Sequence, residues 1–337
     1  MLHLRVVVPE ELADDVLELL QQEPAACNLI HMPGVARKPD GDVILVDLAR
    51  EDASVVLADR RELEVHRHGS IAVEQVDFQI SEHMERVIDI APGSPADAVV
   101  WEEVEARTSE SAELNWSFVL FMVLAGLIAS VGILLDSPIL VVGAMVVGPE
   151  FGPIAGFAVA IVERRPGLAL RSFGALAVGF PVAIGAVTLA VLVFQWIDVS
   201  PENFDASSHA LSDSIANPDF FAFFVAFCAG VAGVLSLTAA KSGALIGVLI
   251  SVTTIPAAAN IGVAAAYGEW SDAAGSLGQL VVNIAALLLA GTLTLAVSRG
   301  LYGRRRRRHE RMSPGRSPRA AVTASERPRS SDRRRHP

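Results

Sequence analysis

The chain has little cysteine, and its histidines follow no ligand pattern. Cys27 and Cys228 are the only cysteines among 337 residues, so neither a disulfide framework nor a cysteine metal site is expected. His66, His68 and His83 are loosely spaced and have no cysteine partner, which favours ordinary surface histidines over zinc ligands. The sequence therefore predicts no metal site.

The short motifs of the common enzyme classes are also missing. The chain contains no nucleophile elbow G-x-S-x-G, no zinc-binding H-E-x-x-H, no phosphate-binding G-x-x-x-x-G-K and no G-x-G-x-x-G. We therefore expect neither an enzyme nor a bound cofactor.

Charge is distributed unevenly along the chain. Residues 1–113 carry 9 Lys/Arg against 25 Asp/Glu, residues 114–298 carry 4 against 10, and residues 299–337 carry 14 against 3. The net charge of −11 therefore hides an acidic head, a nearly uncharged body and a basic tail. With 52% apolar residues, the chain is too apolar for a soluble enzyme of this size.

The first 80 residues alternate between strand-like and helical patterns. Their order is strand, helix, strand, strand, helix, strand, which is typical of a ferredoxin-like split βαβ unit. We expect strands at 2–8, 26–32, 43–48 and 71–80, and helices at 10–22 and 53–63. The chain start lacks the basic and apolar regions of a signal peptide, so this α+β domain is expected in the cytoplasm.

The rest of the chain contains six apolar segments long enough to cross a bilayer as helices, for which about 20 residues suffice. They cover residues 116–135, 139–162, 168–197, 220–237, 244–267 and 273–297. All are rich in glycine and alanine, which favours close helix packing in lipid. We therefore expect an α-helical polytopic membrane domain at 115–298, joined by a linker at 91–114 to the soluble domain at 1–90.

The charges of the connecting loops predict the orientation. If the first domain is cytoplasmic, the loops with Arg164, Arg165, Arg171 and Lys241 lie inside, while the opposite loops carry only acidic charges such as Asp136. Because lysine and arginine stay on the cytoplasmic side, both chain ends are expected in the cytoplasm of a plasma-membrane protein.

The middle segment of each group of three is interrupted near its centre. Gly148, Pro149, Gly152 and Pro153 interrupt the second segment, and Pro256 interrupts the fifth. Glycines recur at an offset of 104 residues, and three spans per half make the second half run in the opposite sense. This pattern predicts two inverted three-helix repeats with a midplane site at the breaks, as in secondary transporters. Ordinary proline kinks filled by neighbouring side chains remain the alternative.

The run SPILVVGAMVVGPEFGPI at 137–154 resembles a motif of the bacterial and archaeal membrane family called domain of unknown function 389. VTTIPAAANIGVAAAYGEW at 252–270, with Val282 and Asn283, is similar to that family's second half. The resemblance implies a six-helix membrane domain and no established activity. Glu150 stands where the family pattern has an apolar residue, and Ala257 replaces a second proline, so chemistry at Glu150 would be special to this chain.

Five polar residues are candidates for binding a solute or ion inside the bilayer. A carboxylate such as Glu150 costs about 2.5 to 3.5 kcal/mol at the bilayer centre unless it is paired or hydrated. It is interpreted either as part of a cation or proton site or as a structural cap. The uncharged candidates are equally compatible with interhelical hydrogen bonding. They are Thr253, Thr254, Asn260 and Asn283.

These patterns favour a transporter or channel for a small solute or ion. The alternative is a membrane-anchored sensor or scaffold whose first domain binds a ligand or partner. The tail at 299–337 is rich in Arg, Ser and Pro and is expected to be disordered. The expected partners are the bilayer, further copies of the chain in a homo-oligomer, and anionic lipid headgroups at the arginine run, but no nucleic acid. That run comprises Arg304, Arg305, Arg306, Arg307 and Arg308.

Overall fold

The computed structural model describes residues 1–49, 65–76, 112–200, 210–217, 219–238 and 253–312, together with residues 81, 104, 108–110, 247–248 and 250. The chain divides into two compact units, one formed by Met1–Trp101 with Gly300–Pro337 and the other by Glu102–Arg299. The expected helix at 53–63 and the tail beyond 312 lie outside the described residues.

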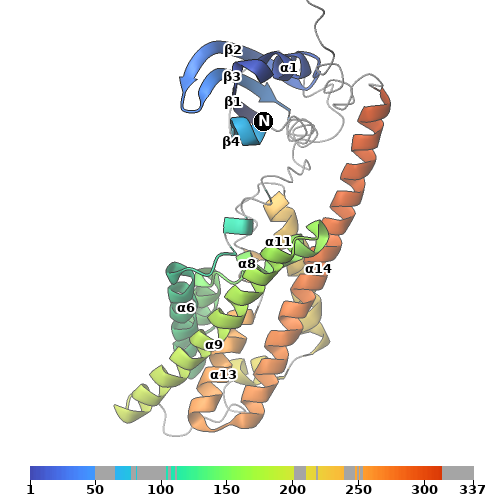
Figure 1. The fold of residues 1–337 in the computed structure, drawn as a ribbon. Helices are drawn as coiled ribbons and strands as arrows, with labels where there is room; N and C mark the ends of the chain where they lie inside the picture. Colours follow the sequence, from blue (N-terminus) through green and yellow to red (C-terminus); the bar gives the residue numbers. More distant parts are fainter. Residues whose placement is uncertain are drawn as a thin grey trace, which may run out of the picture. The chain divides into compact units, whose positions relative to one another are not determined.

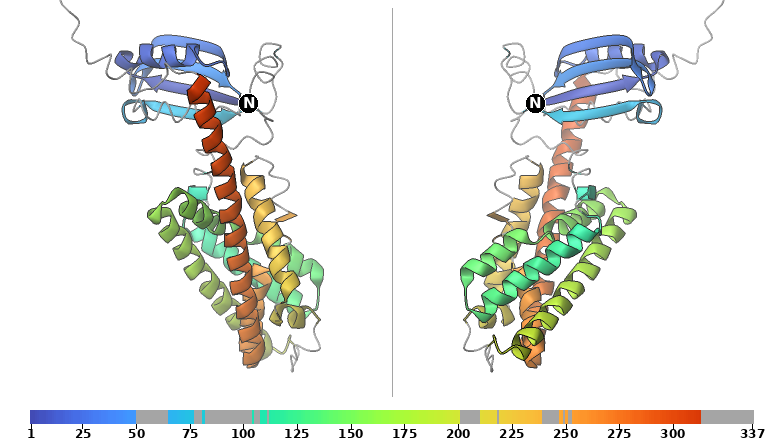
Figure 2. Two further views of the ribbon diagram at one scale, coloured as in Figure 1. Left: turned by 90° about the vertical axis from the view of Figure 1, so that its right-hand side faces the viewer. Right: turned by 90° about the vertical axis from the view of Figure 1, so that its left-hand side faces the viewer.

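The first unit contains a four-stranded antiparallel sheet in the order β2-β3-β1-β4 (Figures 1 and 2). The strands are β1 (Leu2–Val8), β2 (Ala26–Arg37), β3 (Asp40–Leu48) and β4 (Ser70–Gln75). The described part of this unit also contains the helix α1 (Glu10–Gln21) and the single turn α3 (Val65–His68).

Alternation along β1 determines which face of the sheet is buried. Leu2, Leu4, Val6 and Val8 are buried at alternating positions, as expected where successive side chains point to opposite faces. They pack with Val16 and other apolar residues of α1 and β3 in one core. Each fully buried aliphatic side chain contributes about 1.5–3 kcal/mol. This packing fixes the register between β1 and its two neighbours.

Three of the expected strand boundaries differ from the structure. β2 continues to Arg37, five residues past its expected end, because a β-bulge after Met32 keeps it paired with β3. β3 starts at Asp40 instead of residue 43, since the turn beside Gly41 is tight. β4 covers Ser70–Gln75, and residues 77–80 of the expected strand lie outside the described residues.

The second unit is a bundle of apolar helices (Figure 2). Four helices are long and apolar enough to cross a membrane on their own. They are α6 (Trp116–Leu134), α9 (Pro166–Trp196), α11 (Phe220–Thr238) and the portion Trp270–Leu301 of α14 (Trp270–Met312). Each coincides closely with an expected segment, so four of the six expected segments are confirmed as helices of membrane-spanning length and composition.

A bent pair of helices is a fifth candidate span in the described part of the chain. α7 (Pro138–Val147) and α8 (Phe151–Glu163) pass the same test as a pair and meet at an angle of 50°. The sixth expected segment contains α13 (Thr254–Tyr267), which has 14 residues, and much of 244–252 lies outside the described part of the chain. Six spans therefore stay a prediction.

Contacts between helices distant in sequence hold the bundle together. α13 packs against α6, α7 and α9, so the second half of the unit lies directly on the first. The short helix α10 (Ala210–Ala216) also packs on α13. Arg299 of α14 donates hydrogen bonds to Glu163 at the end of α8 and to the Val162 carbonyl.

Candidate functional site

The junction between the two expected breaks is made by Glu150 and Thr254. Glu150 occupies the position before α8, and Thr254 is the first residue of α13. Thr254 Oγ1 donates a hydrogen bond of 2.6 Å to Glu150 Oε1, and both side chains are buried. The structure thus brings together two polar groups that are 104 residues apart in the chain.

The other oxygen of this carboxylate lies against Gly148. A Cβ atom built on Gly148 would stand 2.3 Å from Glu150 Oε2 and 2.6 Å from Ile255 Cγ1. Glu150 Oε2 is buried and has no hydrogen-bond partner among the described residues. Glycine at 148 therefore makes room for both groups, and Ile255 fills the junction with an apolar side chain.

The proline residues lie where a helix begins. Gly148 ends α7, with its N–H bonded to the Ala144 carbonyl at 3.1 Å, and Pro149 follows it outside either helix. Pro153 and Pro256 are each the third residue of their helices, α8 and α13, where a missing N–H leaves no intrahelical bond unmade. Pro256 therefore stands in the first turn of α13, close to Thr253, and not in the interior of a described helix.

Thr253 and Asn283 form a second polar group directly beside Thr254. Asn283 Nδ2 on α14 donates to Thr253 Oγ1 at 2.8 Å. Gln279, one turn earlier on α14, donates to Thr253 Oγ1 at 3.3 Å and to Asn283 Oδ1 at 3.4 Å. Sequence reasoning missed Gln279, although it shares a helix face with Asn283 at the spacing i, i+4.

Asn260 does not belong to this junction. It lies six residues along α13 from Thr254, about 9 Å at the helical rise. Ser212 Oγ of α10 donates to Asn260 Oδ1 at 2.8 Å, and Asn260 Nδ2 donates to Ser276 Oγ at 2.8 Å. All three side chains are fully buried. Asn260 therefore links α10, α13 and α14 through interhelical hydrogen bonds.

A cavity of about 380 Å³ reaches the first break from the beginning of α6. Gly148, Pro149 and Gly152 contribute to its lining. The exposed residues Glu110 and Glu113 also line it, together with apolar side chains. The first break is therefore adjacent to a mostly apolar cavity that carries two carboxylates.

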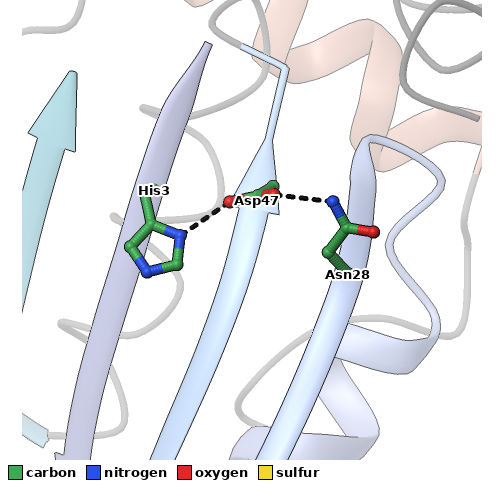
Figure 3. A network of polar contacts seen from close by, with 3 residues as sticks. All are labelled: His3, Asn28 and Asp47. Atoms are coloured by element: carbon green, nitrogen blue, oxygen red, sulfur yellow. Dashed lines mark hydrogen bonds and ion pairs between the residues drawn. The ribbon is translucent and has the colours of Figure 1, made fainter. Parts of the chain in front are cut away.

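A separate polar network crosses three strands of the first unit (Figure 3). His3 Nδ1 lies 2.6 Å from Asp47 Oδ1, and Asn28 Nδ2 donates to Asp47 Oδ2 at 2.7 Å. Burial first, and the charge of Asp47 second, raise the pKa of the neighbouring Cys27 thiol. None of the described residues forms a group of three or more His, Cys, Asp or Glu side chains suited to a metal ion. We interpret the network as structural.

The fold and the junction define the class of protein: a mostly helical chain with several helices that are long and apolar enough to cross a membrane, and a small antiparallel-sheet domain. The model of a protein family described as Domain of unknown function (DUF389) matches residues 145–289, from the end of α7 to the middle of α14. The expected family resemblance of the membrane motifs is thereby confirmed over residues 145–289.

One relative is an uncharacterized protein of Methanocaldococcus jannaschii, 25% identical over 192 residues. The match covers 57% of this chain and 57% of the relative, so the chain spans little more than half of that protein's length. No solved structure matches the chain.

Proposed function

We propose that this chain is a membrane transporter or channel for a small solute or ion, with its site where Glu150 meets Thr254. The observation that carries the proposal is the 2.6 Å hydrogen bond between these two residues, one at each break. Irregular backbone at membrane depth is tolerated where protein or a cavity satisfies it, and interrupted helices are where transporters place their sites.

We further propose that the membrane unit consists of two inverted repeats related by an offset of 104 residues. Contacts within each half support this. Gly126 of α6 lies against Ala183 of α9, and Gly230 of α11 lies against Leu287 of α14, both 104 residues later. These pairs are spatial neighbours, so the common occurrence of glycine and alanine does not explain the agreement.

A second set of contacts follows the same offset. A Cβ atom on Gly156 of α8 would lie 2.9 Å from Ser172 Oγ, close to the Thr108 carbonyl. The positions 104 residues later are Asn260, Ser276 and Ser212, which form the buried hydrogen-bonded cluster. A short helical segment therefore precedes the three expected spans of each half: residues 108–110 in the first half and α10 in the second.

Contacts between the halves support a two-fold relation. Gly262 of α13 lies against Val187 of α9, and Gly291 of α14 lies against Ala158 of α8. Exchanging the halves adds 104 to the number of Val187 and subtracts 104 from that of Gly262. The result is the second pair, Gly291 and Ala158. Glu150 and Thr254 exchange with each other, so their hydrogen bond lies on the two-fold axis.

The proposed orientation follows from the number of spans. Two inverted trios require six spans, with both chain ends on the cytoplasmic side of a plasma membrane. On that side lie a ferredoxin-like domain at 1–90, a linker at 91–114 and the basic tail at 299–337, whose Arg304 to Arg308 run would contact anionic lipid headgroups. The strand order β2-β3-β1-β4 supports the ferredoxin-like assignment. Further copies of the chain, as a homo-oligomer, belong to the same proposal.

The test is flux through the purified chain in liposomes. Vesicles loaded with a pH-sensitive or cation-sensitive dye are challenged with gradients of protons, alkali cations and small organic solutes. Flux of one of them is expected, and Glu150→Gln and Thr254→Val are each expected to lower it at least tenfold, because they remove the charge or the hydroxyl of the junction. Thr188→Val is the matched control, since Thr188 donates to the Gly262 carbonyl away from the junction.

Two results would overturn the proposal. Flux that is unchanged in both junction variants excludes the site, and the absence of any flux excludes transport. In the second case the chain acts as a membrane-anchored sensor or scaffold, and deleting residues 1–112 abolishes its cellular effect.

A further inference from the structure

Two buried oxygen atoms near the junction accept no hydrogen bond from a described residue. They are Glu150 Oε2 and Gln279 Oε1, in side chains that are 4% and 3% exposed. Buried polar atoms are almost always paired, because an unpaired one loses its hydrogen bonds to water without gaining others. Both atoms are acceptors, so the missing partner is a hydrogen-bond donor or a cation.

The carboxylate strengthens this requirement. Among the described residues, no lysine or arginine forms an ion pair with Glu150, and its contact with Thr254 is a neutral hydroxyl. A buried charge without a partner is far more costly than a buried hydrogen-bonding group. An ionised Glu150 therefore needs a cation or a bound proton as its partner at the junction.

The neighbouring residues fix the orientation of the second oxygen. Gln279 has two amide hydrogens, directed to Thr253 Oγ1 and to Asn283 Oδ1. Because both amide hydrogens are used, only the carbonyl oxygen of Gln279 remains for a ligand. Thr253 and Thr254 are adjacent in the chain, and they bond Gln279 and Glu150 respectively, so the two side chains that carry the unpaired oxygens contact neighbouring residues.

The break in the helix removes one backbone hydrogen bond. The carbonyl of Met145 in α7 would bond the amide of Pro149, but proline has no N–H. Carbonyls at the ends of half-helices coordinate cations in broken-helix transporters. Glu150 itself stands at the N-terminal end of α8, where the helix dipole favours its negative charge.

We propose that a dehydrated monovalent alkali cation binds between Glu150 and Gln279. This inference rests on the proposed function and specifies the ion that the site binds. One carboxylate with neutral oxygens matches a single positive charge. Magnesium and calcium prefer more carboxylates or retained water. The surplus of acceptors excludes an anion, since a second negative charge would meet Glu150 Oε2 without a donor.

The experiment measures cation binding separately from flux. The full chain, purified in detergent, is unfolded by heat in NaCl, KCl or choline chloride at constant ionic strength. A saturable rise in Tm is expected with Na⁺ or K⁺ and not with choline, roughly 5 °C at 100 times Kd. Isothermal titration calorimetry with the same salts gives Kd directly.

Three variants locate the site. Glu150→Gln and Gln279→Leu are expected to remove the cation-dependent rise in Tm, and Glu150→Asp to retain part of it because the charge remains. Thr188→Val removes a hydrogen bond elsewhere and should lower Tm in every salt while keeping the difference between salts. This control separates loss of binding from loss of fold.

Each outcome has a defined meaning. Equal Tm values in all three salts, or a cation effect that persists in both Glu150→Gln and Gln279→Leu, overturns the cation site. A Tm that follows pH but not cation shows that a proton alone balances Glu150, and also overturns it. Cation binding without flux leaves the site standing and rejects transport, whereas flux without cation-dependent stabilisation does the reverse.

Discussion

Ile255 lies directly on Gly148, and the free oxygen of Glu150 lies beside the same glycine. A methyl group at Gly148 would meet both within 2.6 Å. Gly148→Ala is therefore expected to destabilise the chain by about 1–3 kcal/mol, the usual cost of overpacking. Thermal or denaturant unfolding in detergent measures the change.

Gly143, five residues earlier, provides the control. A Cβ atom there would meet nothing within 4 Å, so Gly143→Ala is expected to be neutral or to stabilise α7 by up to about 1 kcal/mol. Equal effects of the two substitutions would contradict the close packing of the breaks.

Ser276 and Ser172 are 104 residues apart and differ in their hydrogen bonding. Ser276 Oγ accepts from Asn260, whereas Ser172 Oγ is buried without a partner among the described residues. Ser276→Ala leaves Asn260 with an unpaired amide hydrogen and is expected to cost about 1–3 kcal/mol. Ser172→Ala removes an unpaired hydroxyl and is expected to be neutral or stabilising. Unfolding of both variants under one condition decides the matter.

Asp42 makes the first unit sensitive to acid. The backbone hydrogen bond from Gly34 at 2.9 Å, followed by the contact with His31 at 2.7 Å, holds the pKa of Asp42 below its ordinary range. Because the folded pKa is the lower one, its stabilisation is present above the unfolded pKa of about 3.9 and is lost as pH falls through the folded pKa.

Unfolding of the first unit, monitored by circular dichroism between pH 6 and pH 2.5, measures this loss of stability. Asp42→Asn is expected to flatten the acid limb of the stability curve. Asp14→Asn, at an exposed position of α1, serves as the control and should leave that limb unchanged. An acid limb that is identical in wild type and Asp42→Asn would contradict the assignment.

Cys27 is expected to be an unreactive thiol. It is 5% exposed, and burial followed by the charge of Asp47 raises its pKa. In a Cys228→Ser background, alkylation by iodoacetamide at pH 8 should be at least tenfold slower than that of a free cysteine, because the thiolate is the nucleophile. Asp47→Asn should increase the rate by removing the nearby charge. A wild-type rate equal to that of a free thiol would refute this expectation.

Cysteines introduced on two loops test the proposed six-span topology. In a chain without Cys27 and Cys228, Gly167→Cys at the start of α9 is expected to react with a membrane-impermeant maleimide only after cells are opened. Glu269→Cys, between α13 and α14, is expected to react in intact cells. Labelling of both positions from the same side would exclude an odd number of spans between them.

The membrane helices were predictable because their signal is strong and local. Long apolar runs gave α6, α9, α11 and the membrane part of α14 to within a few residues. Alternation in residues 2–8 gave β1 with its observed bounds. β2 was predicted too short because its continuation depends on pairing with β3 across a bulge, which a single strand does not reveal.

The junction was only partly predictable. The proline and glycine residues indicated where the backbone is interrupted, and an intramembrane carboxylate is unusual enough to single out Glu150. Gln279 was overlooked because a glutamine on a mostly apolar helix has no distinctive spacing, and its role depends on α13 lying beside α14. Asn260 was assigned to the junction because it lies only six residues after Thr254 in the sequence. The sequence alone does not show that these six residues form a helix that carries Asn260 away from the break.

The bond between Glu150 and Thr254 also explains why the proposed two halves differ at this point. An acid at both positions would bring two carboxylates within hydrogen-bond reach of each other. Like charges that close cannot both ionise, so one of them would have to keep a proton. A threonine opposite a single acid provides a neutral hydroxyl donor instead. In the proposed two-fold arrangement, unequal residues at these equivalent positions therefore avoid electrostatic repulsion.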